Sequence, residues 1–131
     1  MRDYRQLLQN VNEAGVYRLN CPVEDLYESV QSAGFVLFNA DITEAQSKGE
    51  VLAELARTIQ APEWFGHNWD ALADALGDLS WREAPGYVLL LNGATFGPDD
   101  YETLNSILKA TVMFWKLQGK PFWVFFTDAN L

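Results

Sequence analysis

Three short, continuous apolar runs constrain the fold of this chain more than any other feature. They are GFVLFNAD at 34–41, YVLLLNG at 87–93 and FWVFFTD at 122–128. Such runs are typical of strands covered on both faces, because a half-exposed strand would alternate apolar and polar residues. The segments between the runs have helical spacing. The sequence therefore predicts an α/β fold, with a small parallel three-stranded sheet covered by helices.

Helix-start and helix-stop signals locate the connecting helices. One helix is expected after Ser47, where Glu50 three residues later completes a capping box. A longer helix begins at Pro98 and stops before Gly119. These segments are long enough to return the chain across the sheet.

The first 33 residues add to this core. VYRL at 16–19 reads as a short strand, and a helix is expected between Pro22 and Gly34. We therefore expect a single domain over 1–131, with a core at 34–131 and an N-terminal extension at 1–33 that supplies one more strand and helix.

Charge and cysteine content limit the possible partners and compartment. Acids outnumber bases 18 to 9 in 131 residues, and the bases occur singly, so direct nucleic-acid binding is not expected. An acidic surface suits a basic protein partner, although acidity also serves solubility alone. Cys21 is the only cysteine, and no segment resembles a signal peptide or a membrane span. The sequence predicts a cytoplasmic protein without a membrane partner.

The segment WFGHNWDALADALGD at 64–78 has the pattern of a capped amphipathic helix. Asn68 is a suitable N-cap, and the first helical turn favours the negative charge of Asp70. The apolar positions, which we expect to face the core, are Trp69, Leu72, Leu76 and Leu79.

Three carboxylates on this segment, Asp70, Asp74 and Asp78, are spaced i, i+4, i+8 and are called here the acidic stripe. Like charges at this spacing repel by a few tenths of a kcal/mol per pair, and no Lys or Arg occurs between 63 and 79 to offset them. The stripe favours an interaction surface, with an ordinary solvated helix face as the alternative.

A metal or acid–base site is the third reading of the same segment. His67, Asp70 and Asp74 are ligand types that can share one metal ion. However, His67 is the only histidine, and no phosphate loop or nucleophile motif occurs in the chain. We therefore expect no metal, no cofactor and no catalytic residue.

The run PEWFGHNWDAL at 62–72 resembles the central motif of the barstar family, an aromatic pair followed by Gly-x-Asn-x-Asp-Ala-Leu. The order of elements over 34–131 is similar too. The resemblance implies that Asp74 takes the place of a substrate phosphate in a ribonuclease cleft. It also implies that Asp70 pairs with basic groups at the cleft rim, that Trp64 stacks on the enzyme, and that Asn68 lies at the contacting loop–helix junction.

Some positions depart from the best-known member of that family. Ala73 and Gly77 stand where it has Trp and Thr, Phe114 stands approximately where it has an acid, and Asp78 replaces a small residue. These departures imply a different basic partner. The complete set of expected partner-binding residues is Trp64, Asn68, Asp70, Ala73, Asp74, Gly77 and Asp78.

The leading hypothesis is a non-catalytic intracellular inhibitor, an immunity protein or antitoxin. It would block the basic active-site cleft of a cognate ribonuclease or nuclease toxin with an acidic helix and the loop before it. The alternative is a protein-interaction or regulatory domain with a non-nuclease partner. The identity of the partner and the oligomeric state stay open at this point.

Overall fold

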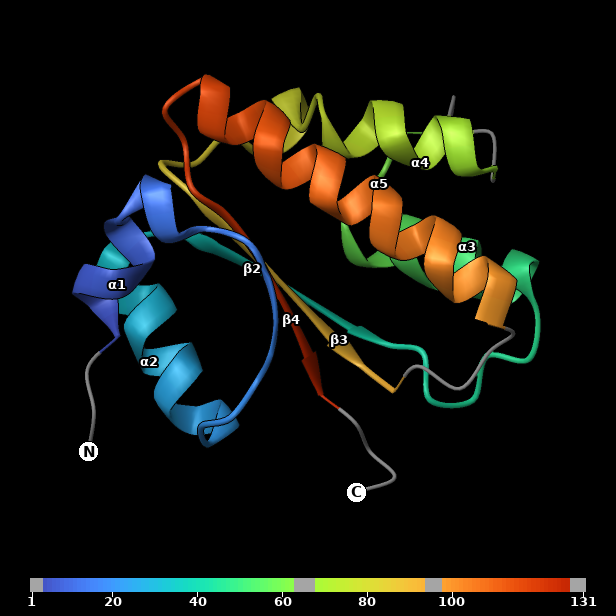
Figure 1. Cartoon of the computed structure of the whole chain (residues 1–131), viewed down its shortest axis with the longest axis horizontal. Coiled ribbons are helices and arrows are strands. Elements are labelled where there is room, and N and C mark those ends of the chain that lie inside the picture. The colour runs from blue at the N-terminus through green and yellow to red at the C-terminus, as the bar shows by residue number, and fades with distance from the viewer. Residues whose placement is uncertain (1–3, 63–67, 94–97, 128–131) are drawn as a thin grey trace.

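The computed structural model describes residues 4–62, 68–93 and 98–127, which form an α/β fold around one four-stranded sheet (Figure 1). All the strand pairs are parallel, and the strand order is β1-β4-β3-β2. The strands are β1 Val16–Arg18, β2 Val36–Asp41, β3 Tyr87–Asn92 and β4 Phe122–Thr127. The three apolar runs are therefore strands β2, β3 and β4, as predicted.

The sheet interior explains why these runs are continuously apolar. In β3 the residues from Tyr87 to Leu91 are all buried, and Leu89 pairs with Phe38 of β2 and Val124 of β4. A strand with neighbours on both edges and helices on both faces has no solvent side for polar residues.

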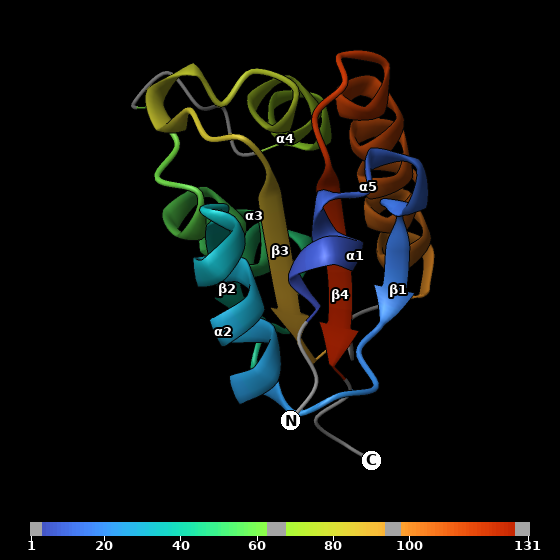
Figure 2. The ribbon, with the colours of Figure 1, turned by 90° about the vertical axis from the view of Figure 1, so that its left-hand side faces the viewer.

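Helices cover both faces of the sheet, as Figures 1 and 2 show. The short helix α1 and helix α2 lie on one face, and α3, α4 and α5 lie on the other. Short 3-10 turns occupy Val11–Glu13 and Ser80–Arg82. The helix bounds are α1 Arg5–Gln9, α2 Val23–Ala33, α3 Lys48–Thr58, α4 Trp69–Leu76 and α5 Pro98–Leu117.

The N-terminal segment extends the sheet, as expected. Strand β1 pairs with β4 in parallel, with Val16 opposite Val124. The indole N–H of Trp123, which is 2% exposed, donates to the Leu8 carbonyl at 2.8 Å. The Tyr4 amide donates to the Ser29 hydroxyl at 2.9 Å. The buried Trp123–Leu8 bond thus joins this segment to the core at 34–131, whereas the Tyr4–Ser29 bond holds α1 against α2 within the segment itself.

The predicted helix signals are present with small differences. The Glu50 amide donates to the Ser47 hydroxyl at 3.2 Å, and the Glu50 carboxylate accepts from the Gln46 amide at 3.1 Å, one residue before the cap. Gly34 ends α2 in the left-handed conformation, with φ of 74°. No helix in the ranges 4–62, 68–93 and 98–127 is long and apolar enough to cross a membrane.

Candidate functional site

Helix α4 begins as the sequence predicts. Asn68 has an extended backbone (φ −136°, ψ 171°), and its side-chain oxygen accepts a hydrogen bond from the Ala71 amide at 2.7 Å. This bond satisfies one of the amides that a helix start leaves without an intrahelical partner. Asp70 lies in the first turn, where the helix dipole stabilises its charge.

The inner side of α4 is part of the hydrophobic core. Leu72 and Ala75 are fully buried, and Leu76 is 1% exposed. Trp69 packs against the same core and is half-buried. This side of the helix fixes α4 against α5 and α3, so the exposed residues are held on a rigid element.

The acidic stripe does not lie entirely on the helix. Asp70 and Asp74 are exposed on α4, but the helix ends at Leu76, and Asp78 lies in the turn that follows. The predicted i, i+4, i+8 helical spacing is therefore wrong at its third position. Among the described residues, neither Asp70 nor Asp74 forms a hydrogen bond or an ion pair through its carboxylate.

Backbone geometry after Leu76 explains this difference. Both the Asp78 and the Leu79 amides donate to the Ala75 carbonyl at 3.1 Å, and Leu79 then adopts a left-handed φ of 50°. Leu79 is nevertheless fully buried. An apolar residue at helical spacing thus reaches the core from a turn instead of from the helix.

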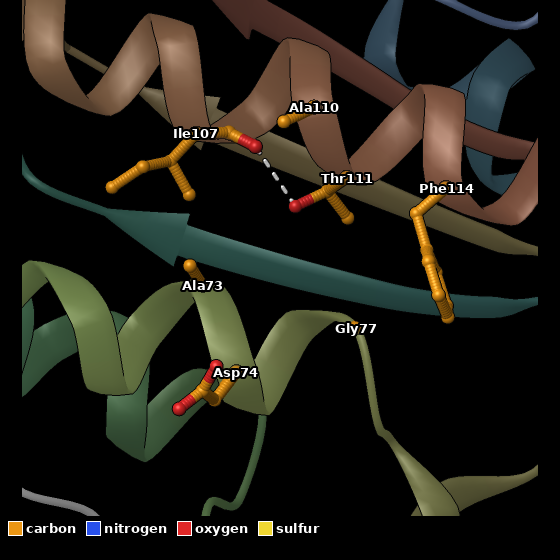
Figure 3. A pocket seen from close by; sticks show the side chains of 7 residues that line it. All are labelled: Ala73, Asp74, Gly77, Ile107, Ala110, Thr111 and Phe114. Atoms are coloured by element: carbon orange, nitrogen blue, oxygen red, sulfur yellow. Dashed lines mark hydrogen bonds between the residues drawn. The ribbon is translucent and has the colours of Figure 1, made fainter.

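Helix α5 runs beside α4 in the same direction (Figures 1 and 3). A buried hydrogen bond joins the two helices. The indole N–H of Trp115 donates to the Leu76 carbonyl at 2.8 Å. That carbonyl belongs to the last turn of α4, where helix carbonyls have no intrahelical donor. The bond holds the end of α4 against α5.

An open groove lies between these two helices, with a volume of about 340 Å³. In Figure 3, Ala73 points toward α5, whereas the Asp74 carboxylate is directed away from it at the edge of α4. The Phe114 side chain extends from α5 toward the end of α4 at Gly77 (Figure 3). The groove is lined by Ala73, Asp74, Gly77, Ile107, Ala110, Thr111 and Phe114.

The groove surface is largely apolar. The Thr111 hydroxyl donates to the Ile107 carbonyl at 2.9 Å, so its polar group is already engaged. Phe114 is 43% exposed. Gly77 has an ordinary helical backbone, and a Cβ added there would lie 3.4 Å from the Ala73 carbonyl oxygen, a normal contact. The small size of residue 77 is therefore not required by the backbone.

The structure brings together part of the expected partner-binding set. Ala73, Asp74 and Gly77 line one groove, and Asn68 and Asp70 lie at the start of the same helix. Trp64 lies outside the described residues.

The α5 side of the groove was not among the expected binding residues. A signal for it exists in the spacing of Ile107, Ala110, Thr111 and Phe114, which is i, i+3, i+4, i+7. This spacing defines a second helix side, adjacent to the buried one. That this side of α5 lines a groove becomes evident only from the position of α4 beside it.

The metal reading gains no support from the described part of the chain. That part contains no group of three or more His, Cys, Asp or Glu side chains arranged to hold a metal ion. His67, which the metal reading requires, lies outside the described residues.

The fold and this face define a class of small α/β domain with a parallel sheet and an exposed acidic helix. Residues 35–127 match the family described as barstar (barnase inhibitor), and the chain belongs to this family. Comparison with individual curated proteins gives no match. Members of the family are non-catalytic inhibitors, and membership implies a partner of the barnase-type ribonuclease class.

Proposed function

We propose that this chain inhibits a barnase-type ribonuclease by covering its basic active-site cleft with α4 and the loop that precedes it. Asp74 occupies the position of a substrate phosphate, and Asp70 pairs with basic groups at the rim of the cleft. As an immunity protein or antitoxin, the chain would act inside the cell and protect that cell's RNA.

The observation that carries this proposal is the state of the outer side of α4. Asp70 and Asp74 are exposed on a helix whose inner side is locked into the core, and no described cation neutralises them. A ribonuclease cleft presents Arg and Lys to RNA phosphates, and carboxylates satisfy the same donors with charge-assisted hydrogen bonds. The net charge of −9 adds long-range attraction to a basic enzyme.

Titration of a set of basic bacterial ribonucleases of the barnase type with the purified chain tests the proposal, and at least one of them should be inhibited. Cleavage of a fluorogenic RNA substrate should fall to zero near a 1:1 molar ratio, and the association rate should decrease as salt rises from about 0.05 to 0.5 M because the attraction is screened. Ribonuclease activity that stays unchanged at excess chain, for barnase and for other basic bacterial ribonucleases of its type, would contradict the proposal.

The apolar side of α5 favours a second candidate, a binding domain whose partner is not a nuclease. Met113, Phe114 and Leu117 are 52%, 43% and 78% exposed, and they are neighbours on one helix surface. This candidate predicts no inhibition of any ribonuclease. It also predicts that Asp74→Asn leaves partner binding unchanged.

A further inference from the structure

The groove between α4 and α5 has no role in the phosphate mimicry assigned to Asp74. We infer that it receives an aromatic side chain of the basic partner, which sits beside the cation that pairs with Asp74. This inference rests on the proposed function, because it specifies a contact that the same ribonuclease partner would make.

The shape of the groove fits a flat ring. Its walls are small at Ala73, Ala110 and Gly77, and Phe114 offers a partly exposed ring at one end. Aromatic rings pack in offset or edge-to-face pairs, so a ring entering here has a partner of its own kind. Aromatic residues are also enriched in protein interfaces.

The lining of the groove favours an apolar occupant over a polar one. The Thr111 hydroxyl is engaged with the Ile107 carbonyl, and Thr111 is only 5% exposed, so it presents little polar surface to the groove. The one charged lining group is the Asp74 carboxylate, which lies at the edge of α4 and is directed away from α5 (Figure 3). An apolar group inside the groove therefore matches the apolar lining, and a cation at the edge matches the Asp74 carboxylate.

The groove is preformed, which lowers the entropy cost of filling it. Leu72 and Leu76 of α4 are buried, as are Leu108 and Trp115 of α5, and the Trp115 indole bonds to the Leu76 carbonyl. The open space at Gly77 is not a consequence of backbone strain, because its φ is −84°. A rigid site of this kind binds without reorganisation.

The charge around the groove determines the kind of partner. Asp70 on α4 and Asp78 in the turn after α4 are exposed, as Asp74 is. The whole chain carries a net charge of −9. An aromatic side chain on an acidic protein would be repelled from this face. The occupant is therefore an aromatic residue with an Arg or Lys close to it in space.

Short peptides test this recognition without the complete partner. In an extended tripeptide, residues one and three project on the same side, so N-acetyl-Phe-Gly-Arg-amide carries both groups. Titrated into the ¹⁵N-labelled chain, it should shift the amide signals of Ala73, Gly77, Ala110 and Phe114. It should bind about tenfold more tightly than N-acetyl-Ala-Gly-Arg-amide, since burying part of a phenyl ring has about that effect.

Substitutions that fill the groove with a larger side chain test the same contact, with a matched control elsewhere on the chain. Ala110→Leu and Ala73→Leu should each weaken binding of the Phe-Gly-Arg peptide by about tenfold. Ala53→Leu is the control, because Ala53 is also an exposed helix alanine, on α3. Asp74→Asn should reduce the preference for N-acetyl-Phe-Gly-Arg-amide over N-acetyl-Phe-Gly-Glu-amide, and Asp70, Asp78 and the remaining net charge account for what is left of it.

Three results would overturn the inference. These are equal binding of the Phe and Ala peptides, signal shifts confined to residues outside the groove, and unchanged binding after Ala110→Leu and Ala73→Leu. The ribonuclease titration separates this inference from the proposed function. Inhibition of a barnase-type ribonuclease without peptide selectivity refutes the groove contact alone, whereas peptide selectivity without inhibition of any such enzyme refutes the ribonuclease partner.

Discussion

The two sides of α4 differ in what determines their residues. On the inner side, Leu72 and Leu76 are buried in the core, where α4 packs against α5 and α3, and their size and position are set by that packing. On the outer side, Asp70, Ala73 and Asp74 are exposed and no described residue pairs with either carboxylate. Folding therefore explains the inner side, and on the outer side it explains only Asp70, which the helix dipole favours. Asp74 has no role in the fold, which is the pattern expected when a partner supplies the missing contact.

The outer side also carries a repulsion between its own carboxylates. Carboxylates at i, i+4 repel by a few tenths of a kcal/mol, and the described structure places no cation between Asp70 and Asp74. A basic cleft would turn this repulsion into attraction. The four substitutions below separate the two sides by their effects on stability.

The largest effect on stability is expected for Leu72→Ala. Removing a fully buried leucine side chain leaves a cavity and should lower the free energy of unfolding by about 2–5 kcal/mol. Chemical denaturation monitored by circular dichroism measures this change. A loss below about 1 kcal/mol would show that the inner side is not well packed.

Trp115→Phe tests the link between α4 and α5. The substitution keeps a ring in the core but removes the indole donor from the Leu76 carbonyl, and we expect a loss of about 1–3 kcal/mol. Hydrogen exchange should show the largest loss of protection at the end of α4. Uniform loss across the sheet would contradict a local role for this bond.

Asn68→Ala removes the cap of α4. The Ala71 amide then loses its side-chain acceptor, and the expected cost is about 1 kcal/mol. Asn68→Asp is the matched control, since aspartate accepts the same bond and should restore stability within about 0.5 kcal/mol. Equal destabilisation by both variants in thermal unfolding would argue against the capping role.

The smallest effect on stability is expected for Asp74→Ala. An exposed carboxylate without a described partner contributes little, so the free energy of unfolding should change by less than about 0.5 kcal/mol. A small gain is expected if repulsion from Asp70 is relieved. A loss above 1 kcal/mol would mean that Asp74 supports the fold, and the contrast between the two sides of α4 would fail.

The same contrast explains how far the sequence could predict the structure. The strands β2, β3 and β4 follow from apolar runs, and the start of α4 follows from Asn68, because both are local signals. The end of α4 was not predictable, since Leu79 continues the apolar spacing while its backbone turns left-handed to reach the core.

The groove depends on tertiary packing and was therefore hidden. Ala73 and Gly77 could be named from the family resemblance, but the groove residues on α5 lie 30 to 41 residues further along the sequence. An aromatic residue such as Phe114 is normally expected in the core. Its exposure is known only once α5 is placed beside α4. Local spacing defines which residues share a helix side, not which helix lies next to it.

The most direct test of the central claim compares the inhibition constants of two variants, each with one neutralised carboxylate, against the barnase-type ribonuclease that the chain inhibits. Asp74→Asn removes a charge from the outer side of α4, and Glu28→Gln removes one from exposed α2, on the opposite face of the sheet. We predict that Asp74→Asn weakens inhibition by about 100-fold or more, the effect of leaving buried cations unpaired, while Glu28→Gln changes it by less than about threefold. Equal effects of the two substitutions would contradict the claim that Asp74 is the carboxylate the partner recognises.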